Sequence, residues 1–230
     1  ASLYPPPAAQ LALATGVRDV LTALLASPNI ASRRPLFEQY DCIVQSRTVR
    51  RPEEAGAAVL WLRDLAAPDR VGSSAGAERS PRDLGDRAPA IAASTDCNGR
   101  RVAADPYTGT IEAALECAAN LACAGAQPLG TTNNLNFGNP EKPHIAWQLV
   151  EAVRGLGDAC RALAAPVVGG NVSLYNEGSA GPIYPTPVVG MVGLLDDPAR
   201  AGRTAFQREG DAIALVGWDD DRSLAASELA

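Results

Sequence analysis

Apolar residues recur along this chain with two periods, and the two alternate from one segment to the next. Spacings of three and four residues, as from Ile145 to Leu149 to Val153, are typical of helices with one buried face. They predict helices at 16–27, 35–40, 107–124 and 140–164. Short apolar runs predict strands at 44–49, 57–62, 90–95, 126–132, 166–174, 187–195 and 212–218. Because strands alternate with helices, the pattern predicts an α/β fold built in layers.

One segment follows neither period. Residues 67–88 are rich in Gly, Ser, Pro and Arg and hold almost no large apolar side chain. Such a stretch cannot bury enough surface to offset the entropy that is lost on ordering. We expect a disordered surface loop that is inserted between two strands.

The net charge of the 230-residue chain is −6, from 20 basic and 26 acidic residues. This balance argues against a surface that binds nucleic acid or an anionic membrane. No run of about 18 apolar residues occurs, so we expect no membrane-spanning segment. The start, from Ala1 to Pro7, lacks the charged and then apolar pattern of a signal peptide.

Cysteine and histidine usage narrows the possible chemistry. The five cysteines form no Cys-x-x-Cys pair and their number is odd, so we expect reduced, partly buried thiols in a cytoplasmic protein. His144 is the only histidine, which argues against a zinc site. It falls in the first turn of a predicted helix, where we expect a surface or packing role. No cysteine has a histidine in its sequence context, and we predict no catalytic residue in this chain.

The most informative motif is 169–177, Gly-Gly-Asn-Val-Ser-Leu-Tyr-Asn-Glu, which follows the apolar run 166–168. Two glycines let the backbone approach a ligand closely. Asn171 and Ser173 share one face if the segment is extended. Amide and hydroxyl oxygens beside bare backbone can bind a phosphate or a magnesium ion. The alternative is a Gly-Asn turn between two strands.

A second polar segment, 131–141, has the sequence Thr-Thr-Asn-Asn-Leu-Asn-Phe-Gly-Asn-Pro-Glu. Together the two segments resemble phosphoribosylformylglycinamidine synthase, and more closely its long synthetase subunit. The resemblance continues through 94–100 (Ser-Thr-Asp-Cys-Asn-Gly-Arg), 105–107 and 184–193, and spans residues 16–217 with a gap at the polar insertion. Motifs this long, in this order, are far more specific than a lone glycine pattern.

The resemblance implies an architecture. Members of the family hold two copies of a two-part unit that is shared with aminoimidazole ribonucleotide synthetase. The first part of each unit is a half-barrel sheet packed with helices, and the second is a sheet-and-helix layer. Residues 1–40 are then the end of the first copy, 41–195 the barrel-forming domain of the second copy, and 196–230 the start of its second part. The chain therefore resembles an internal fragment, and we do not expect it to catalyse alone.

The resemblance also implies roles within the two segments. Gly170 is expected to contact ATP, Asn171 to bind magnesium, and Ser173 to bind formylglycinamide ribonucleotide. Asn133 lies where many members have an aspartate that contacts the nucleotide. The asparagine keeps an oxygen acceptor and removes a charge, which favours contact with ATP over metal ligation.

Plainer roles stay open for several of these residues. Asn171 could be a solvated residue in a β-bulge, and Asn139 above all could cap the helix that is entered at Pro140. Asp96 precedes an Asn98-Gly99 step, which favours a hairpin turn over a ligand role for Asp96.

A third group, Asp105, Glu116 and Asn120, offers only oxygen ligands, which suit magnesium. Glu116 and Asn120 are four residues apart and share one face of a predicted helix. In large members of the family, similarly placed residues belong to a second nucleotide site that is structural. We therefore expect an auxiliary nucleotide or metal site, and the alternative is an ordinary polar helix face.

As a whole, the resemblance implies part of an ATP-dependent ligase of purine biosynthesis, with ATP and Mg²⁺ as cofactors. The complete enzyme joins glutamine-derived ammonia to formylglycinamide ribonucleotide and forms formylglycinamidine ribonucleotide. The implied partners are a separate glutaminase subunit, a small bridging subunit and the rest of the synthetase. The alternatives are another ATP-using member of the superfamily, such as an aminoimidazole ribonucleotide synthetase-like enzyme, and a non-catalytic nucleotide-binding module.

Overall fold

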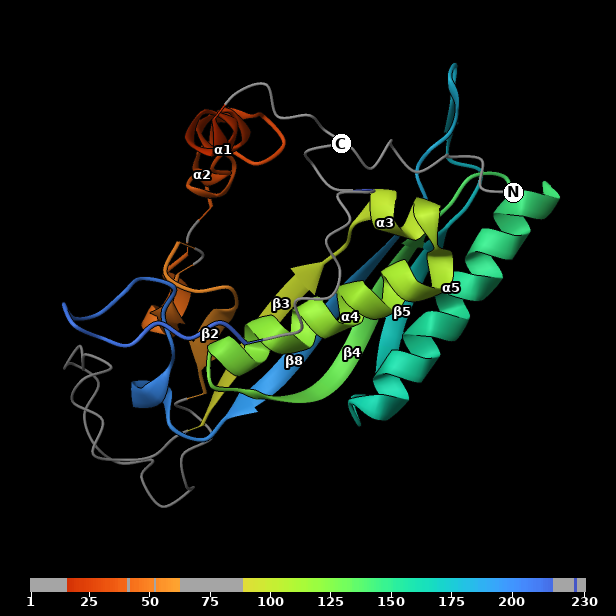
Figure 1. Ribbon diagram of the computed structural model, residues 1–230. Coiled ribbons are helices and arrows are strands. Elements are labelled where there is room, and N and C mark those ends of the chain that lie inside the picture. The colour runs from red at the N-terminus through yellow and green to blue at the C-terminus, as the bar shows by residue number, and fades with distance from the viewer. Residues whose placement is uncertain (1–15, 41, 52, 63–88, 217–225, 227–230) are drawn as a thin grey trace.

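The computed structural model describes residues 16–40, 42–51, 53–62, 89–216 and 226. The disordered insertion predicted at 67–88 lies outside the described residues. Figure 1 shows a sheet with two long helices laid across it. The α/β fold in layers that the alternating pattern predicts is therefore confirmed.

Six strands form the main sheet. In spatial order they are β1 (Thr48–Arg50), β2 (Ala58–Trp61), β3 (Ala90–Asp96), β8 (Thr186–Leu195), β4 (Gln127–Asn136) and β5 (Val167–Ser173). Each neighbouring pair is antiparallel except β4 and β5, which are parallel. Among the described strands β5 pairs on one side only, so it lies at the edge of the sheet. The carboxyl ends of β4 and β5 therefore meet at one end of the sheet.

Helices cover one face of this sheet (Figure 1). α4 (Pro106–Cys123) lies across β3 and β8, and α5 (Pro143–Ala162) packs against α4. The short α3 (Gly99–Ala104) comes directly before α4. The remaining elements are α1 (Val17–Ala26), α2 (Arg34–Phe37), the 3-10 turns η1 (Val44–Ser46) and η5 (Pro198–Arg200), and a two-stranded ribbon of β6 (Glu177–Gly178) and β7 (Gly181–Pro182).

Small side chains let the layers approach one another closely. The main core joins the inner face of α4, including Ala114 and Cys117, to Val189 and Met191 of β8. Gly155 of α5 lies against the backbone of α4, where a Cβ atom would collide with a carbonyl oxygen. Because protein interiors are densely packed, one added methyl group at such a point is costly. The packing of α5 on α4 therefore depends on a glycine.

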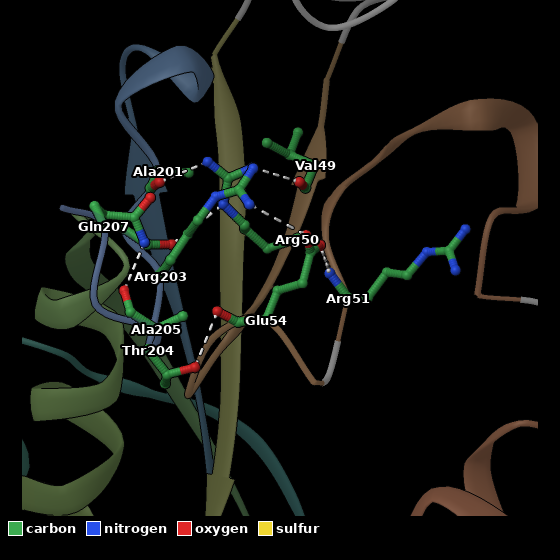
Figure 2. A network of polar contacts seen from close by, with 10 residues as sticks. Val49, Arg50, Arg51, Glu54, Ala201, Arg203, Thr204, Ala205 and Gln207 are labelled. Atoms are coloured by element: carbon green, nitrogen blue, oxygen red, sulfur yellow. Dashed lines mark hydrogen bonds and ion pairs between the residues drawn. The ribbon is translucent and has the colours of Figure 1, made fainter. Parts of the chain in front are cut away.

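A polar network fastens the segment after β8 to β1 and to the turn that follows β1 (Figure 2). Arg50 of β1 donates a hydrogen bond to the carbonyl oxygen of Ala201 at 2.7 Å. Thr204 donates to the carbonyl oxygen of Glu54 through its backbone N–H at 3.0 Å and its hydroxyl at 3.2 Å. Residues about 150 positions apart in the sequence are thereby held side by side.

Most of the predicted elements are confirmed, with boundaries shifted by a few residues. The strand predicted at 44–49 is wrong in its first half, which forms η1, and only Thr48–Arg50 pairs with a neighbour. The last predicted strand is also absent from its described part, because residues 211–216 form no regular element. An apolar run becomes a strand only where a partner satisfies its backbone.

The hairpin predicted at Asn98-Gly99 is wrong. Asn98 instead caps α3, where its side-chain oxygen accepts hydrogen bonds from the N–H groups of Arg100 and Arg101, both at 3.2 Å. Asparagine serves well in this role, because its amide oxygen replaces the missing partner of the first helical N–H groups. The same short side chain favours both structures, and tertiary context decides between them.

The thiols match the expectation from sequence. All five cysteines are free. Burial raises the pKa of Cys117 to about 12 and that of Cys97 to about 11. Both stay protonated at neutral pH, and a protonated thiol is a poor nucleophile.

No helix in the described part of the chain is long and apolar enough to cross a bilayer.

Candidate functional site

The two polar segments singled out from the sequence lie side by side on β4 and β5. Their parallel pairing sets Asn133 beside Gly170, Asn134 beside Asn171, and Asn136 beside Ser173. In α/β sheets, ligands commonly bind just beyond the carboxyl ends of neighbouring strands. The pairing thus brings together all four residues that are predicted to bind the nucleotide, the metal and the substrate.

These residues divide between the two faces of the sheet, because side chains along a strand alternate. Asn171 and Ser173 share the face opposite α4 and α5, which confirms the shared face expected from their spacing. Asn133 is paired with Val189, a core residue under α4, so Asn133 and its neighbour Gly170 lie on the helix side.

At position 170 the side chain of Asn133 leaves little room for a Cβ atom. A Cβ atom on Gly170 would lie 2.7 Å from Oδ1 of Asn133, whereas one on Gly169 would have no atom within 4 Å. The side chain of Asn133 makes no hydrogen bond to a described residue, so its amide is available to a ligand. Of the two glycines, only Gly170 is therefore closely approached by a neighbouring side chain, whose end would have to move to admit a Cβ atom.

Asn171 lies on a regular strand. The register between β4 and β5 is unbroken from Thr132 to Asn136, so the turn that was open for Asn171 is wrong. The β-bulge is displaced: the register shifts just before, where Thr131 and Thr132 pair with Val167 and Gly169, and Asn171 itself is exposed. Its Nδ2 donates to Oδ1 of Asn134 at 3.0 Å. The oxygen of Asn171 then has no partner among the described residues, and an amide oxygen is a ligand that magnesium accepts.

The start of α5 differs from the prediction. The helix begins at Pro143, not at Pro140, and its N-cap residue Lys142 makes no capping bond with its side chain. Asn139 accepts a hydrogen bond from the N–H of Glu141 at 2.8 Å, which closes a turn before the helix. The cap predicted for Asn139 is therefore replaced by a local turn, another structure that asparagine favours. Proline at the first helical position explains the later start.

The predicted auxiliary group is only partly brought together. Asn120 donates to Oδ2 of Asp96 at 3.1 Å, and Glu116 lies one turn before it on α4. Asp105 is instead the N-cap of α4 and accepts from the N–H and the hydroxyl of Thr108, at 3.0 and 2.9 Å. A helix rises about 1.5 Å per residue, which puts Asp105 about 16 Å along the axis from Glu116. Asp96 occupies the place that was expected for Asp105.

The cluster of Asp96, Glu116 and Asn120 concentrates negative charge. Burial raises the pKa of Glu116, and the nearby Asp96 and Glu112 raise it further. Carboxylates that repel one another favour a bound cation. The described residues contain no group of three or more His, Cys, Asp or Glu that could hold a metal ion. A magnesium ion at this cluster would therefore need further oxygen ligands, which the phosphate groups of a nucleotide would have to supply.

Two residues that follow β5 were not predicted from the sequence to matter. Asn176 contacts Ser173, and Glu177 accepts two hydrogen bonds from Nζ of Lys142 at 2.7 and 2.9 Å. The Lys142 ammonium, together with the N–H of Asn139, holds the pKa of Glu177 below its ordinary value. The only signal in the sequence is the Asn-Glu pair that ends the motif, because Lys142, the partner of Glu177, lies 35 positions away.

Known proteins resemble this chain over most of its length. Residues 83–195 match the family AIR synthase related protein, N-terminal domain. Phosphoribosylformylglycinamidine synthase subunit PurL from Synechococcus sp. (strain JA-2-3B'a(2-13)) is 50% identical over 216 residues, which are 92% of this chain and 27% of that protein. PurL from Nostoc sp. (strain PCC 7120 / SAG 25.82 / UTEX 2576) is 49% identical over 205 residues, which are 87% of this chain and 25% of that protein.

Solved structures agree with the fold. T. maritima PurL complexed with ATP is 32% identical with a TM-score of 0.56, and the match covers 74% of this chain and 24% of that chain. T. maritima PurL complexed with FGAR is 32% identical with a TM-score of 0.57 and the same coverage. The chain spans about a quarter of the length of the relatives that it matches. It therefore belongs to the family of phosphoribosylformylglycinamidine synthase subunit PurL.

Proposed function

We propose that this chain forms part of an ATP-dependent ligase that makes formylglycinamidine ribonucleotide for purine biosynthesis. The observation that carries the proposal is the parallel pairing of Asn133 with Gly170 and of Asn136 with Ser173. It gathers the residues of two distant motifs at the carboxyl ends of two strands. Complexes of T. maritima PurL with ATP and with FGAR support the choice of nucleotide and substrate.

The edge of β5 explains how one site can use residues from both faces. An edge strand leaves half of its N–H and C=O groups without a strand partner, so Gly170 can contact ATP through its backbone. Asn133 reaches the nucleotide from the helix side. Asn171 offers its amide oxygen to magnesium on the opposite face, beside Ser173, which binds the ribonucleotide.

The chemistry follows from the reaction class. The substrate amide oxygen takes the terminal phosphoryl group of ATP, and ammonia then displaces the phosphorylated oxygen as phosphate. Magnesium, when bound, would neutralise charge on the phosphate oxygens. The residues of this chain bind and orient the reactants, because orientation lowers the entropic part of the barrier. None of its described residues is assigned a proton-transfer role, and His144 lies in the first turn of α5.

The proposal includes partners. A separate glutaminase subunit would supply ammonia and a small bridging subunit would join it to the synthetase, in the cytoplasm. The matching relatives are named as a subunit, which supports an assembly of several chains. Turnover with glutamine should then require the glutaminase subunit, whereas turnover with ammonium should not.

Steady-state kinetics of the full-length gene product that carries this chain test the proposal. With ATP, ammonium and formylglycinamide ribonucleotide, product should form. Ser173→Ala should raise KM for the ribonucleotide about tenfold, because one hydrogen bond to the substrate is lost. Asn171→Ala should lower kcat/KM for ATP and magnesium by about tenfold or more. Val172→Thr, a change at an exposed position between them, is the matched control. Absence of ATP-dependent turnover, or substrate preference for another ribonucleotide, would contradict the proposal and favour a different member of the superfamily.

A second candidate function is a structural nucleotide site at Asp96, Glu116 and Asn120. The contact of Asn120 with Asp96 and the raised pKa of Glu116 favour it. Calorimetric titration with magnesium and ADP should show binding that Asp96→Asn and Glu116→Ala remove. Asp105→Asn should leave that binding in place. An ordinary polar helix face would give the same weak titration in all variants.

A further inference from the structure

The turn that follows β5 folds back onto the end of β4. The N–H of Phe137 donates to the carbonyl oxygen of Ser173 at 3.0 Å, and the N–H of Asn176 donates to the carbonyl oxygen of Phe137 at 3.1 Å. Between them Tyr175 has a φ of 61°, a left-handed conformation that is uncommon outside glycine. This reversal returns the side chain of Asn176 to the hydroxyl group of Ser173.

The contacts of Asn176 settle which way its amide points. Its Nδ2 lies 2.8 Å from the carbonyl oxygen of Ser173 and 3.0 Å from that of Phe137. Carbonyl oxygens only accept hydrogen bonds, so the nitrogen and not the oxygen must face them. The two hydrogens of the nitrogen are both used by these bonds. Nδ2 also lies 3.1 Å from Oγ of Ser173, but the nitrogen has no third hydrogen to donate to it.

The remaining contact fixes the proton of Ser173. Oδ1 of Asn176 lies 3.2 Å from Oγ of Ser173, and an amide oxygen can only accept. The Ser173 hydroxyl is then the donor, and its proton is directed into the protein. The lone pairs of Oγ are left for a ligand. A serine in this state binds an N–H or O–H group and not a phosphate oxygen.

We propose that Asn176 is a positioning residue that makes Ser173 a hydrogen-bond acceptor for an N–H or O–H group of the substrate. This inference rests on the proposed function, which places the ribonucleotide at Ser173. Amide N–H and ribose hydroxyl groups are the donors that such a substrate offers. Asn176 does not touch the substrate, and it acts through the direction of one hydroxyl group.

Kinetics of the full-length gene product with ammonium as nitrogen donor test the inference. Asn176→Ala should raise KM for formylglycinamide ribonucleotide about tenfold and leave KM for ATP within about twofold, since one hydrogen bond loses its geometry. Ser173→Ala should give an increase of similar size. In the double variant the increase should be no larger than in Ser173→Ala alone, because Asn176 then has no hydroxyl to direct.

Two further variants keep the result interpretable. Asn139→Ala removes an amide in the neighbouring turn that does not contact Ser173, and it should leave both KM values unchanged. Asn176→Ser retains one donor for a carbonyl oxygen and should give an intermediate KM if the alanine variant does not fold. If Ser173→Ala has no effect, the proposed function of Ser173 fails. If Ser173→Ala does raise KM but the effect of Asn176→Ala adds to it in full, or raises both KM values alike, the inference is overturned.

Discussion

Gly170 and Asn133 constrain each other across two parallel strands, because a methyl group on Gly170 would lie 2.7 Å from the side-chain oxygen of Asn133. The backbone of Gly170 has no positive φ, so its conformation alone does not require glycine. The pair holds an amide against bare backbone at the place where the nucleotide is proposed to bind. Its geometry gives the first of four predictions.

Gly170→Ala should destabilise the fold by about 0.5–1.5 kcal/mol, the usual cost of an unfavourable rotamer, because the end of the Asn133 side chain must move aside. Asn133→Ala should restore most of this loss in the double variant, because the colliding oxygen is then gone. The free energy of unfolding in urea measures both effects. Gly169→Ala, at a position with open space, is the control. Equal losses at 169 and 170 would refute the pairing.

The crossing of α4 and α5 offers a matched pair of glycines. Gly155→Ala should cost about 1–3 kcal/mol of stability, because its methyl group would collide with the carbonyl oxygen of Tyr107. Gly157→Ala, two residues on, should instead stabilise by about 0.5–1 kcal/mol, as expected at an unobstructed helical site. Thermal unfolding compares the two. A stabilising Gly155→Ala would show that α5 does not cross α4 as described.

The raised pKa of Glu116 predicts a stability change with a defined sign. The folded state disfavours the charged carboxylate, so Glu116 lowers stability above its folded pKa, and this cost fades as the pH falls below the ordinary value of 4.5. Glu116→Gln should therefore stabilise at pH 7.5, by less than about 1 kcal/mol because solvent screens the site. Near pH 3.5 the gain should vanish.

Glu112 provides the control for that experiment. It accepts hydrogen bonds from Arg101 at 2.5 and 2.8 Å, so Glu112→Gln should not stabilise at pH 7.5. Melting temperatures across the pH range are the readout. A Glu116→Gln gain that persists unchanged at pH 3.5 would exclude charge as its cause.

Glu177 should show the opposite pH dependence. Its pKa is lowered by Lys142 and by the N–H of Asn139, so its contribution to stability is complete above 4.5 and is lost as the pH falls through the lowered value. Lys142→Met should raise the pKa of Glu177 toward 4.5, and Lys142→Arg should raise it less. Carboxyl chemical shifts in an NMR pH titration measure this. An unchanged pKa in Lys142→Met would mean that the ion pair does not form in solution.

The sequence predicts most helices and strands because the period of apolar residues is a local property of the chain, although no residue of α1 is buried. It also predicts the shared face of Asn171 and Ser173, which follows from strand geometry alone. It does not place Asp105, because a helix cap and a metal ligand require the same side chain. Nor does the sequence predict the contacts of Asn176 and Glu177. Their partners Phe137 and Lys142 are distant in the sequence and come close only when β4 and β5 pair.

The central claim is that ligands bind at the carboxyl ends of β4 and β5. Hydrogen–deuterium exchange of the full-length gene product tests it most directly, with magnesium, an unreactive ATP analogue and formylglycinamide ribonucleotide. The account predicts that the ligands slow exchange in 133–137 and 169–177 and not in α1. Saturating ligands that protect other regions but leave both segments unchanged would contradict it.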